Sequence, residues 1–317
     1  MLKNHKQITL IMMGILFLVA CSAPAQVVPD NPTQETAAGT VESAAPAPAT
    51  ATSEPLAALV NGEPILLADY ERQIARYEAS MSGGNQEEMT PEEQEGLSEA
   101  REWILDLMID QILITQAAEQ AGTTVTDEEV EAAIQDLIAD IGQETFEQNL
   151  TKEGLTAEEM RAELKTQMLA SRMAEQVANT IPAQAEHVNA RHIVVATEEE
   201  GHQILSQIQA GADFAALAQA YSQDAFTRNQ GGDLGYFPKG VLTSSKVEEA
   251  AFSLQPGQVS DLIQSNLGYH IIQVLDRVPD MEVSPDNLRM LKDKAVRDWL
   301  EGLHTQADVQ RFVSSTP

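Results

Sequence analysis

The sequence reads Gly231-Gly232-Asp233-Leu234-Gly235-Tyr236-Phe237 in its second half, a glycine turn that leads into an apolar strand. A second apolar strand follows at 268–274, and a β-branched strand precedes both at 191–195. Strands and helices are mixed here without regular alternation, which predicts an α+β fold with a small antiparallel sheet. Three segments between the strands have helical spacing, at 199–210, 212–221 and 247–254.

The region before this sheet is predicted to be mainly helical. Residues 59–65 contain an Asn-Gly turn between two short extended pieces, and Asp69 is the expected N-cap of the next helix. Pro182 closes the region because proline cannot continue a helix. Further helix starts, each with Thr followed by acidic residues, are predicted at Thr90-Pro91-Glu92-Glu93, Thr126-Asp127-Glu128-Glu129 and Thr156-Ala157-Glu158-Glu159.

Residues 286–313 return to a helical pattern, with Leu288, Leu291, Trp299 and Leu303 on one face. A lone amphipathic helix must bury its apolar face. We expect it to pack back onto the helices at 56–181, which makes the helical domain discontinuous and the sheet region an insertion.

The N-terminus has the pattern of an export signal. Lys3 and Lys6 precede an apolar run at 8–20, which is too short to span a bilayer and ends at Cys21, the only cysteine. The Leu-Val-Ala-Cys end of this run resembles the lipobox of bacterial lipoproteins, which implies that Cys21 carries the lipid anchor. An ordinary signal peptide with a chance cysteine is the alternative. Residues 22–55 are rich in Ala, Pro and Thr, which predicts a disordered tether.

Charge and histidine spacing exclude several classes of function. The 317 residues include 49 acidic and 19 basic side chains, for a net charge of -30. Nucleic acid is therefore an unsuitable partner, because binding phosphates needs clustered Lys and Arg. His187 and His192 lack a nearby carboxylate pair, and His202 and His304 lie in charged helices, so we expect no metal site and no cofactor.

Residues 190–279 resemble a parvulin-type peptidyl-prolyl cis/trans isomerase domain. The resemblance depends on several motifs in the same order: Ala190-Arg191-His192-Ile193, Phe214-Ala215-Ala216-Leu217-Ala218, the glycine turn at 231–237, Ala250-Ala251-Phe252, Pro256-Gly257-Gln258-Val259-Ser260 and Gly268-Tyr269-His270-Ile271-Ile272. The wider layout is similar to the group of extracytoplasmic foldases and chaperones that includes PrsA and SurA.

This resemblance implies a set of catalytic residues. His192 and His270 correspond to the paired strand histidines of the family, and Asp224 corresponds to the Cys or Asp near the substrate carbonyl. Taken without the family, the two histidines are core residues and Asp224 is a turn residue, and these interpretations stay open. The glycines at 231 and 232 serve the backbone conformation alone.

The resemblance also implies an apolar cup for the proline ring. The expected substrate-binding residues are Leu234, Phe237, Leu242, Val247 and Phe252. The chain is one residue longer than the family pattern between 240 and 250, so that Leu242 replaces Met and Val247 replaces Phe. Valine is smaller than phenylalanine, so we expect a shallower cup and lower catalytic efficiency.

Two functions follow. The first is a lipid-anchored peptidyl-prolyl isomerase and foldase, which acts outside the cytoplasmic membrane on unfolded or partly folded exported polypeptides that contain X-Pro bonds. The second is a non-catalytic holdase chaperone with a degenerate parvulin domain. An extracellular ligand-binding lipoprotein is a third interpretation, without a supporting motif. The expected organisation is a signal peptide (1–20), a lipidated cysteine and tether (21–55), a helical domain (56–185), a parvulin domain (186–279) and a C-terminal helix (280–317).

Overall fold

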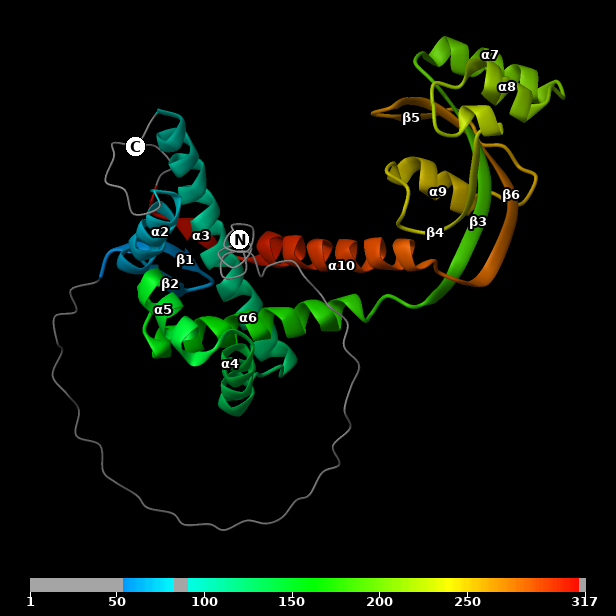
Figure 1. Ribbon diagram of the computed structural model, residues 1–317. Coiled ribbons are helices and arrows are strands. Elements are labelled where there is room, and N and C mark those ends of the chain that lie inside the picture. Colours follow the sequence, from blue (N-terminus) through cyan, green and yellow to red (C-terminus); the bar gives the residue numbers. More distant parts are fainter. Residues whose placement is uncertain (1–53, 83–90, 314–317) are drawn as a thin grey trace, which may run out of the picture. The chain divides into compact units, whose positions relative to one another are not determined.

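The computed structural model describes residues 54–82 and 91–313 (Figure 1). The expected signal peptide at 1–20, Cys21, nearly all of the expected tether and Thr90 lie outside these ranges. Within the ranges, no helix combines the length and the apolar character that are needed to cross a membrane.

A three-stranded sheet begins the described chain. β1 (Leu56–Val60) and β2 (Glu63–Leu66) form the predicted hairpin, whose turn residues Asn61 and Gly62 have φ angles of 51° and 88°. Two successive positive φ angles match the twist of a two-residue hairpin. β7 (Val309–Arg311) pairs with the other edge of β1, which gives the strand order β2-β1-β7.

The prediction of a helix throughout 286–313 is wrong at its end. The helix α10 covers Pro285–Gln306, and the chain then forms β7. The three residues of β7 are too few and too polar to show a strand pattern. They become a strand because the free edge of β1 supplies backbone partners, and strand formation depends on such a context.

The predicted N-cap at Asp69 is also wrong. α2 (Leu67–Ser82) begins directly after β2, and the backbone N–H of Leu67 donates to the Pro55 carbonyl oxygen at 2.8 Å. This backbone partner satisfies a donor that a side-chain cap would otherwise satisfy. Asp69 lies in the first turn, where its carboxylate accepts a hydrogen bond from Arg72 at 2.7 Å.

Four further helices complete the part of this domain that precedes the second sheet. Thr126 and Thr156 form the predicted capping boxes, each with the glutamate three residues later. Gly142, with a φ angle of 87°, separates two helices, of which only the first was predicted. The helices are α3 (Pro91–Ala121), α4 (Asp127–Ile141), α5 (Gln143–Glu153) and α6 (Ala157–Ala178).

α10 packs against α3 and α6, so the predicted discontinuous helical domain is confirmed. Leu303 of α10 contacts the apolar cluster that is built from β1, β2, α2 and α3. The neighbouring His304 places its Nε2 atom 2.5 Å from an Asp110 carboxylate oxygen of α3. We call residues 54–82, 91–178 and 285–313 the helical domain.

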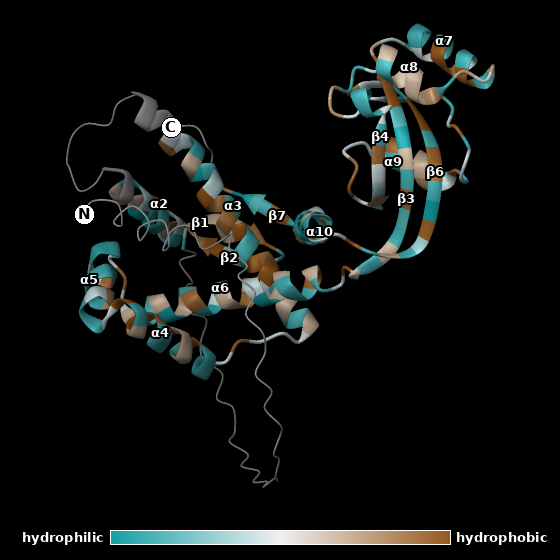
Figure 2. Ribbon diagram, turned by 45° about the vertical axis from the view of Figure 1, so that its right-hand side comes forward, coloured by the Kyte–Doolittle hydropathy of each residue, from teal (hydrophilic) through white to brown (hydrophobic). Residues whose placement is uncertain are grey.

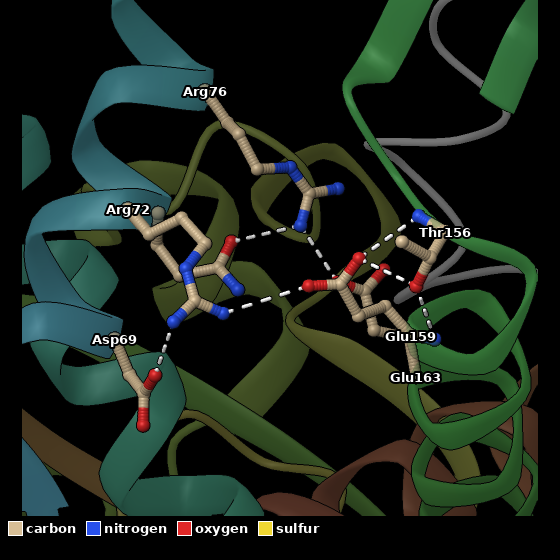
Figure 3. A network of polar contacts seen from close by, with 7 residues as sticks. Asp69, Arg72, Arg76, Thr156, Glu159 and Glu163 are labelled. Carbon is tan, nitrogen blue, oxygen red and sulfur yellow. Dashed lines mark hydrogen bonds and ion pairs between the residues drawn. The ribbon is translucent and has the colours of Figure 1, made fainter. Parts of the chain in front are cut away.

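Ion pairs connect the helices of this domain. Figure 3 shows Arg72 and Arg76 of α2 facing Glu159 and Glu163 of α6, at N–O distances of 3.6 and 2.6 Å respectively. Three further pairs join α4 to α6: Glu131 with Arg161, Asp127 with Lys165 and Glu129 with Arg172.

The rest of the described chain is built around a four-stranded antiparallel sheet. We call residues 184–282 the sheet domain. The strand order is β4-β3-β6-β5. The central strands are longer than predicted, because β3 and β6 pair from Val195 with Tyr269 to Gln184 with Glu282. Pro279 lies where the register of this ladder shifts, a position that tolerates a residue without an N–H. The strands are β3 (Gln184–Val195), β4 (Asp233–Pro238), β5 (Ile263–Ser265) and β6 (Gly268–Glu282).

Helices cover both faces of this sheet. Alternate strand residues point to opposite faces, and Figure 2 shows hydrophobic residues interspersed with hydrophilic ones along β3 and β6. Ile193, Val195 and Ile271 pack against α7 (Glu198–Gln209) and α8 (Phe214–Tyr221). A second cluster on the other face includes Val188, Ala190, Ile272 and Val274, which pack against α9 (Ser245–Ser253). A short 3₁₀ helix, η1, covers Arg228–Gln230.

Candidate active site

The register of β3 and β6 brings the two predicted histidines together. His192 pairs with Ile272, and His270 pairs with Val194. Paired residues and residues two apart share a face, so both imidazoles lie on the face that α9 covers. Their ring centroids are 6.0 Å apart, although the residues are far apart in the sequence.

A loop after α8 carries Asp224 to His192. The backbone N–H of Gln223 donates to the Val194 carbonyl oxygen at 2.7 Å, which attaches the loop to β3. One carboxylate oxygen of Asp224 lies 2.8 Å from His192 Nε2 and accepts a hydrogen bond from the Thr227 hydroxyl at 2.5 Å. The expected juxtaposition of His192 and Asp224 is therefore present.

The carboxylate of Asp224 is held in its ionised form. Burial raises its pKa, but hydrogen bonds from Thr227, His192 and the backbone N–H of Phe226 more than offset this effect, and the net pKa is lowered. The loop thus presents a negative charge beside the imidazole at neutral pH.

His270 is held in its neutral form. Burial, followed by the nearby His192, lowers the pKa of His270 to about 4. Its Nε2 atom lies 2.7 Å from the Ser265 hydroxyl, and its buried Nδ1 atom has no hydrogen-bond partner among the described residues. Thr227 and Ser265 therefore belong to this network. Neither residue was predicted from the sequence, although each lies within five positions of a predicted site residue.

The glycine turn positions the His192 backbone. The His192 N–H donates to the Gly232 carbonyl oxygen at 2.8 Å. Gly232 has a φ angle of 83°, and a Cβ atom there would lie 2.1 Å from the His192 carbonyl oxygen. Gly231 has a φ angle of 72°, and its Cβ atom would lie 2.6 Å from the Ala215 Cβ atom. Both glycines are thus needed for close approach as well as for conformation, so the expectation that they serve conformation alone is wrong.

The five predicted apolar residues all lie in or against the cluster under α9. Phe237 and Val247 are buried, at 4% and 3% exposure, and form part of the core. Leu234, Leu242 and Phe252 are partly buried and pack against that core. This cluster shares the sheet face of His192 and His270.

Glu248 is a buried carboxylate that was not predicted as a site residue. Its Oε1 atom accepts hydrogen bonds from the backbone N–H groups of Gly240 at 2.8 Å and Leu242 at 3.1 Å. It therefore holds the loop that carries Leu242. The sequence contains a signal for this role, because Glu248 lies between Val247 and Ala251 on the buried face of a short helix.

In the described ranges 54–82 and 91–313, no three His, Cys, Asp or Glu side chains form a group that could hold a metal ion.

The fold and the site together define a parvulin-type peptidyl-prolyl isomerase. Residues 177–278 match the PPIC-type PPIASE domain family, and residues 1–174 match the SurA-like N-terminal domain family.

Curated relatives identify the particular family. The foldase protein PrsA of Caldanaerobacter subterraneus is 33% identical over 279 residues, which cover 83% of this chain and 89% of the relative. PrsA of Oceanobacillus iheyensis is 32% identical over 64% of this chain and 71% of the relative. The crystal structure of PrsA from Bacillus anthracis has a TM-score of 0.40 and 28% identity, and covers 63% of this chain and 88% of that one.

The chain belongs to the PrsA foldase family and is a peptidyl-prolyl isomerase of the parvulin type. The predicted enzyme is thereby confirmed, and the alternative of a non-catalytic holdase is not favoured.

Proposed function

We propose that His192, Asp224 and His270 catalyse the rotation of X-Pro bonds in unfolded or partly folded exported polypeptides. The observation that supports this assignment is the closeness of the three side chains. Asp224 lies 2.8 Å from His192 Nε2, and the His192 and His270 rings, 6.0 Å apart, share the sheet face that carries the apolar cluster. Leu234, Leu242 and Phe252 contact the proline ring, and Phe237 and Val247 support them from the core.

The chemistry needs neither a nucleophile nor a broken bond. Rotation about the peptide bond is opposed by a barrier of about 18–20 kcal/mol, which comes from delocalisation of the nitrogen lone pair onto the carbonyl oxygen. Catalysis therefore means that the site binds the twisted imide better than it binds either planar isomer.

The ionised Asp224 carboxylate favours the twisted state. The planar imide carries partial negative charge on its carbonyl oxygen, and a carboxylate close to this oxygen disfavours that charge separation. When the imide twists, the oxygen loses negative charge and the repulsion falls. His192 holds the carboxylate in place, and the neutral His270 completes the floor of the site without adding a positive charge.

A peptide assay on the full-length protein tests this assignment. We expect catalysed isomerisation of a short Ala-Pro peptide, and a fall in kcat/KM of about 100-fold for Asp224→Ala. Asp224→Asn retains a hydrogen-bonding oxygen without the charge and should lose nearly as much. A rate for Asp224→Ala equal to that of the unchanged protein would remove Asp224 from the site, and full activity in Asp224→Asn would remove the charge argument.

The sequence also supports an anchor and an extracytoplasmic location. We infer that the signal at 1–20 is removed, that Cys21 receives a lipid, and that 22–55 tethers the folded body to the outer side of the cytoplasmic membrane or within the periplasm. The proposed domain limits remain 56–185, 186–279 and 280–317. Cys21→Ser should move the protein from the membrane fraction to the soluble fraction, and an unchanged distribution would contradict the anchor.

A further inference from the structure

Two exposed apolar side chains lie beside the histidine network. Phe226 is 89% exposed and Leu267 is 59% exposed, which makes them the two most exposed large hydrophobic side chains among the described residues. Exposure of large apolar side chains next to a binding site is informative, because folding alone would favour their burial.

Phe226 is attached to the His192 side of the network. Its backbone N–H donates to the Asp224 Oδ1 atom at 3.1 Å, while the Oδ2 atom of the same carboxylate lies 2.8 Å from His192 Nε2. The Phe226 backbone is therefore fixed by the carboxylate that we place next to the substrate carbonyl, while its ring stays in solvent.

Leu267 is attached to the His270 side in the same way. Its backbone N–H donates to the Ser265 hydroxyl oxygen at 3.0 Å, and this hydroxyl lies 2.7 Å from His270 Nε2. The two imidazole rings, whose centroids are 6.0 Å apart, therefore lie between the loop that carries Phe226 and the turn that carries Leu267.

We propose that Phe226 and Leu267 are specificity-determining residues that bind the side chains adjacent to the substrate proline. The inference rests on the function proposed above, because it takes the histidine network as the place where the imide lies. A peptide bound across this network extends in both directions from its proline, and an exposed apolar side chain with an anchored backbone stands on each side.

Phe226 and Leu267 together form an apolar rim beside the site, and this rim selects apolar neighbours of proline. Leucine or phenylalanine next to proline would bury apolar surface against Phe226 or Leu267, whereas glutamate would lose hydration without gaining a partner. Unfolded exported chains expose such apolar residues, so the rim directs the isomerase to X-Pro bonds that a folded client would bury.

The test compares peptides that differ only in the residues adjacent to proline. In full-length protein, we expect kcat/KM to be about 10-fold higher for Leu or Phe than for Glu. Phe226→Ala and Leu267→Ala keep the backbone N–H groups and should each lower this ratio about 3-fold. Phe226→Leu should restore most of it, since the effect depends on apolar area.

Leu275→Ala is the matched control. Leu275 is also exposed, at 41%, and lies on β6 away from the network, so its removal should leave the ratio unchanged. An equal ratio in the unchanged protein, Phe226→Ala and Leu267→Ala would overturn the proposal. So would an effect of Leu275→Ala as large as theirs.

Dissociation constants of the same peptides, measured by NMR titration, separate this proposal from the proposed function. If no peptide is isomerised, the catalytic assignment fails. The dissociation constants then still test whether Phe226 and Leu267 bind the residues adjacent to proline. Weaker binding of the Leu and Phe peptides to Phe226→Ala and Leu267→Ala supports it, and unchanged dissociation constants overturn it.

Discussion

The two domains of this chain are stabilised in different ways. In the sheet domain, two buried apolar clusters lie on the two faces of a long β3-β6 ladder. In the helical domain, one apolar cluster is supplemented by exposed ion pairs. Of the seven Lys and Arg residues between 56 and 185, six form ion pairs with acidic side chains. The proposed catalytic network thus occupies the domain whose geometry depends least on screened charges.

The same difference explains part of the acidity. Because six of the seven basic side chains between 56 and 185 are already paired, few cations are left to neutralise the other carboxylates of this region. Such a surface keeps the protein soluble and repels acidic chains.

The largest expected effect is that of Gly232→Ala. A Cβ atom at this position would meet the His192 carbonyl oxygen at 2.1 Å, and the φ angle of 83° adds backbone strain. We expect a loss of roughly 4 kcal/mol or more in the unfolding free energy of the sheet domain, and loss of isomerase activity. Calorimetry of the full-length protein should show the sheet-domain transition shifting while the helical-domain transition stays.

Gly257→Ala is the matched control for this change. Gly257 has a similar φ angle of 88°, but a Cβ atom there would meet no other atom within 4 Å. The expected cost is backbone strain alone, about 1 kcal/mol. Equal losses for the two variants would show that the close approach to His192 is unimportant.

Glu248→Ala is expected to have the next largest effect. It leaves the backbone N–H groups of Gly240 and Leu242 without their acceptor, at a cost of roughly 2–3 kcal/mol. Since the loop carries Leu242, we also expect KM for an Ala-Pro peptide to rise. Glu249→Ala, at the exposed neighbouring position, is the control. An unchanged KM in Glu248→Ala would show that the loop of Leu242 plays no part in substrate binding.

The pH dependence of stability provides a third comparison. With a pKa of about 4 in the folded state and 6.5 in the unfolded chain, His270 binds its proton only in the unfolded chain between these values. The contribution of His270 to the unfolding free energy is therefore fully present above pH 6.5 and is lost as the pH drops toward 4. Between pH 7.5 and 5, the sheet domain should lose about 2 kcal/mol.

His270→Asn removes this titration. Its sheet-domain stability, measured by chemical denaturation at each pH, should change less over the same range than that of the unchanged protein. A pH profile identical in both proteins would show that His270 is not held neutral.

The smallest effect belongs to the ion pairs. Arg76→Gln breaks the contact with Glu163 between α2 and α6 and should lower the stability of the helical domain by about 0.5 kcal/mol. High salt should reduce this difference. Arg289→Gln is the control, because Arg289 pairs only within α10, with Asp286, and both side chains are largely exposed. A larger loss for Arg289→Gln would contradict the interhelical role of Arg76.

Local signals predicted many of the elements correctly. The Asn61-Gly62 turn and the capping boxes at Thr126 and Thr156 each depend on neighbours within a few residues. The errors have a common origin. Asp69 loses its capping role to the Pro55 carbonyl, β7 forms only on the edge of β1, and Glu248 is bound to a loop whose path the sequence does not show.

The order of motifs along the chain was sufficient to show the resemblance to the parvulin family, and this resemblance implied the fold, the paired histidines and Asp224. The tertiary structure alone decided which residues touch. The β3-β6 register joins His192 to His270, the loop attached to Val194 carries Asp224 to His192, and the packing of α9 makes Phe237 and Val247 core residues. These contacts depend on distances between segments that are remote in sequence, and local propensity does not encode such distances.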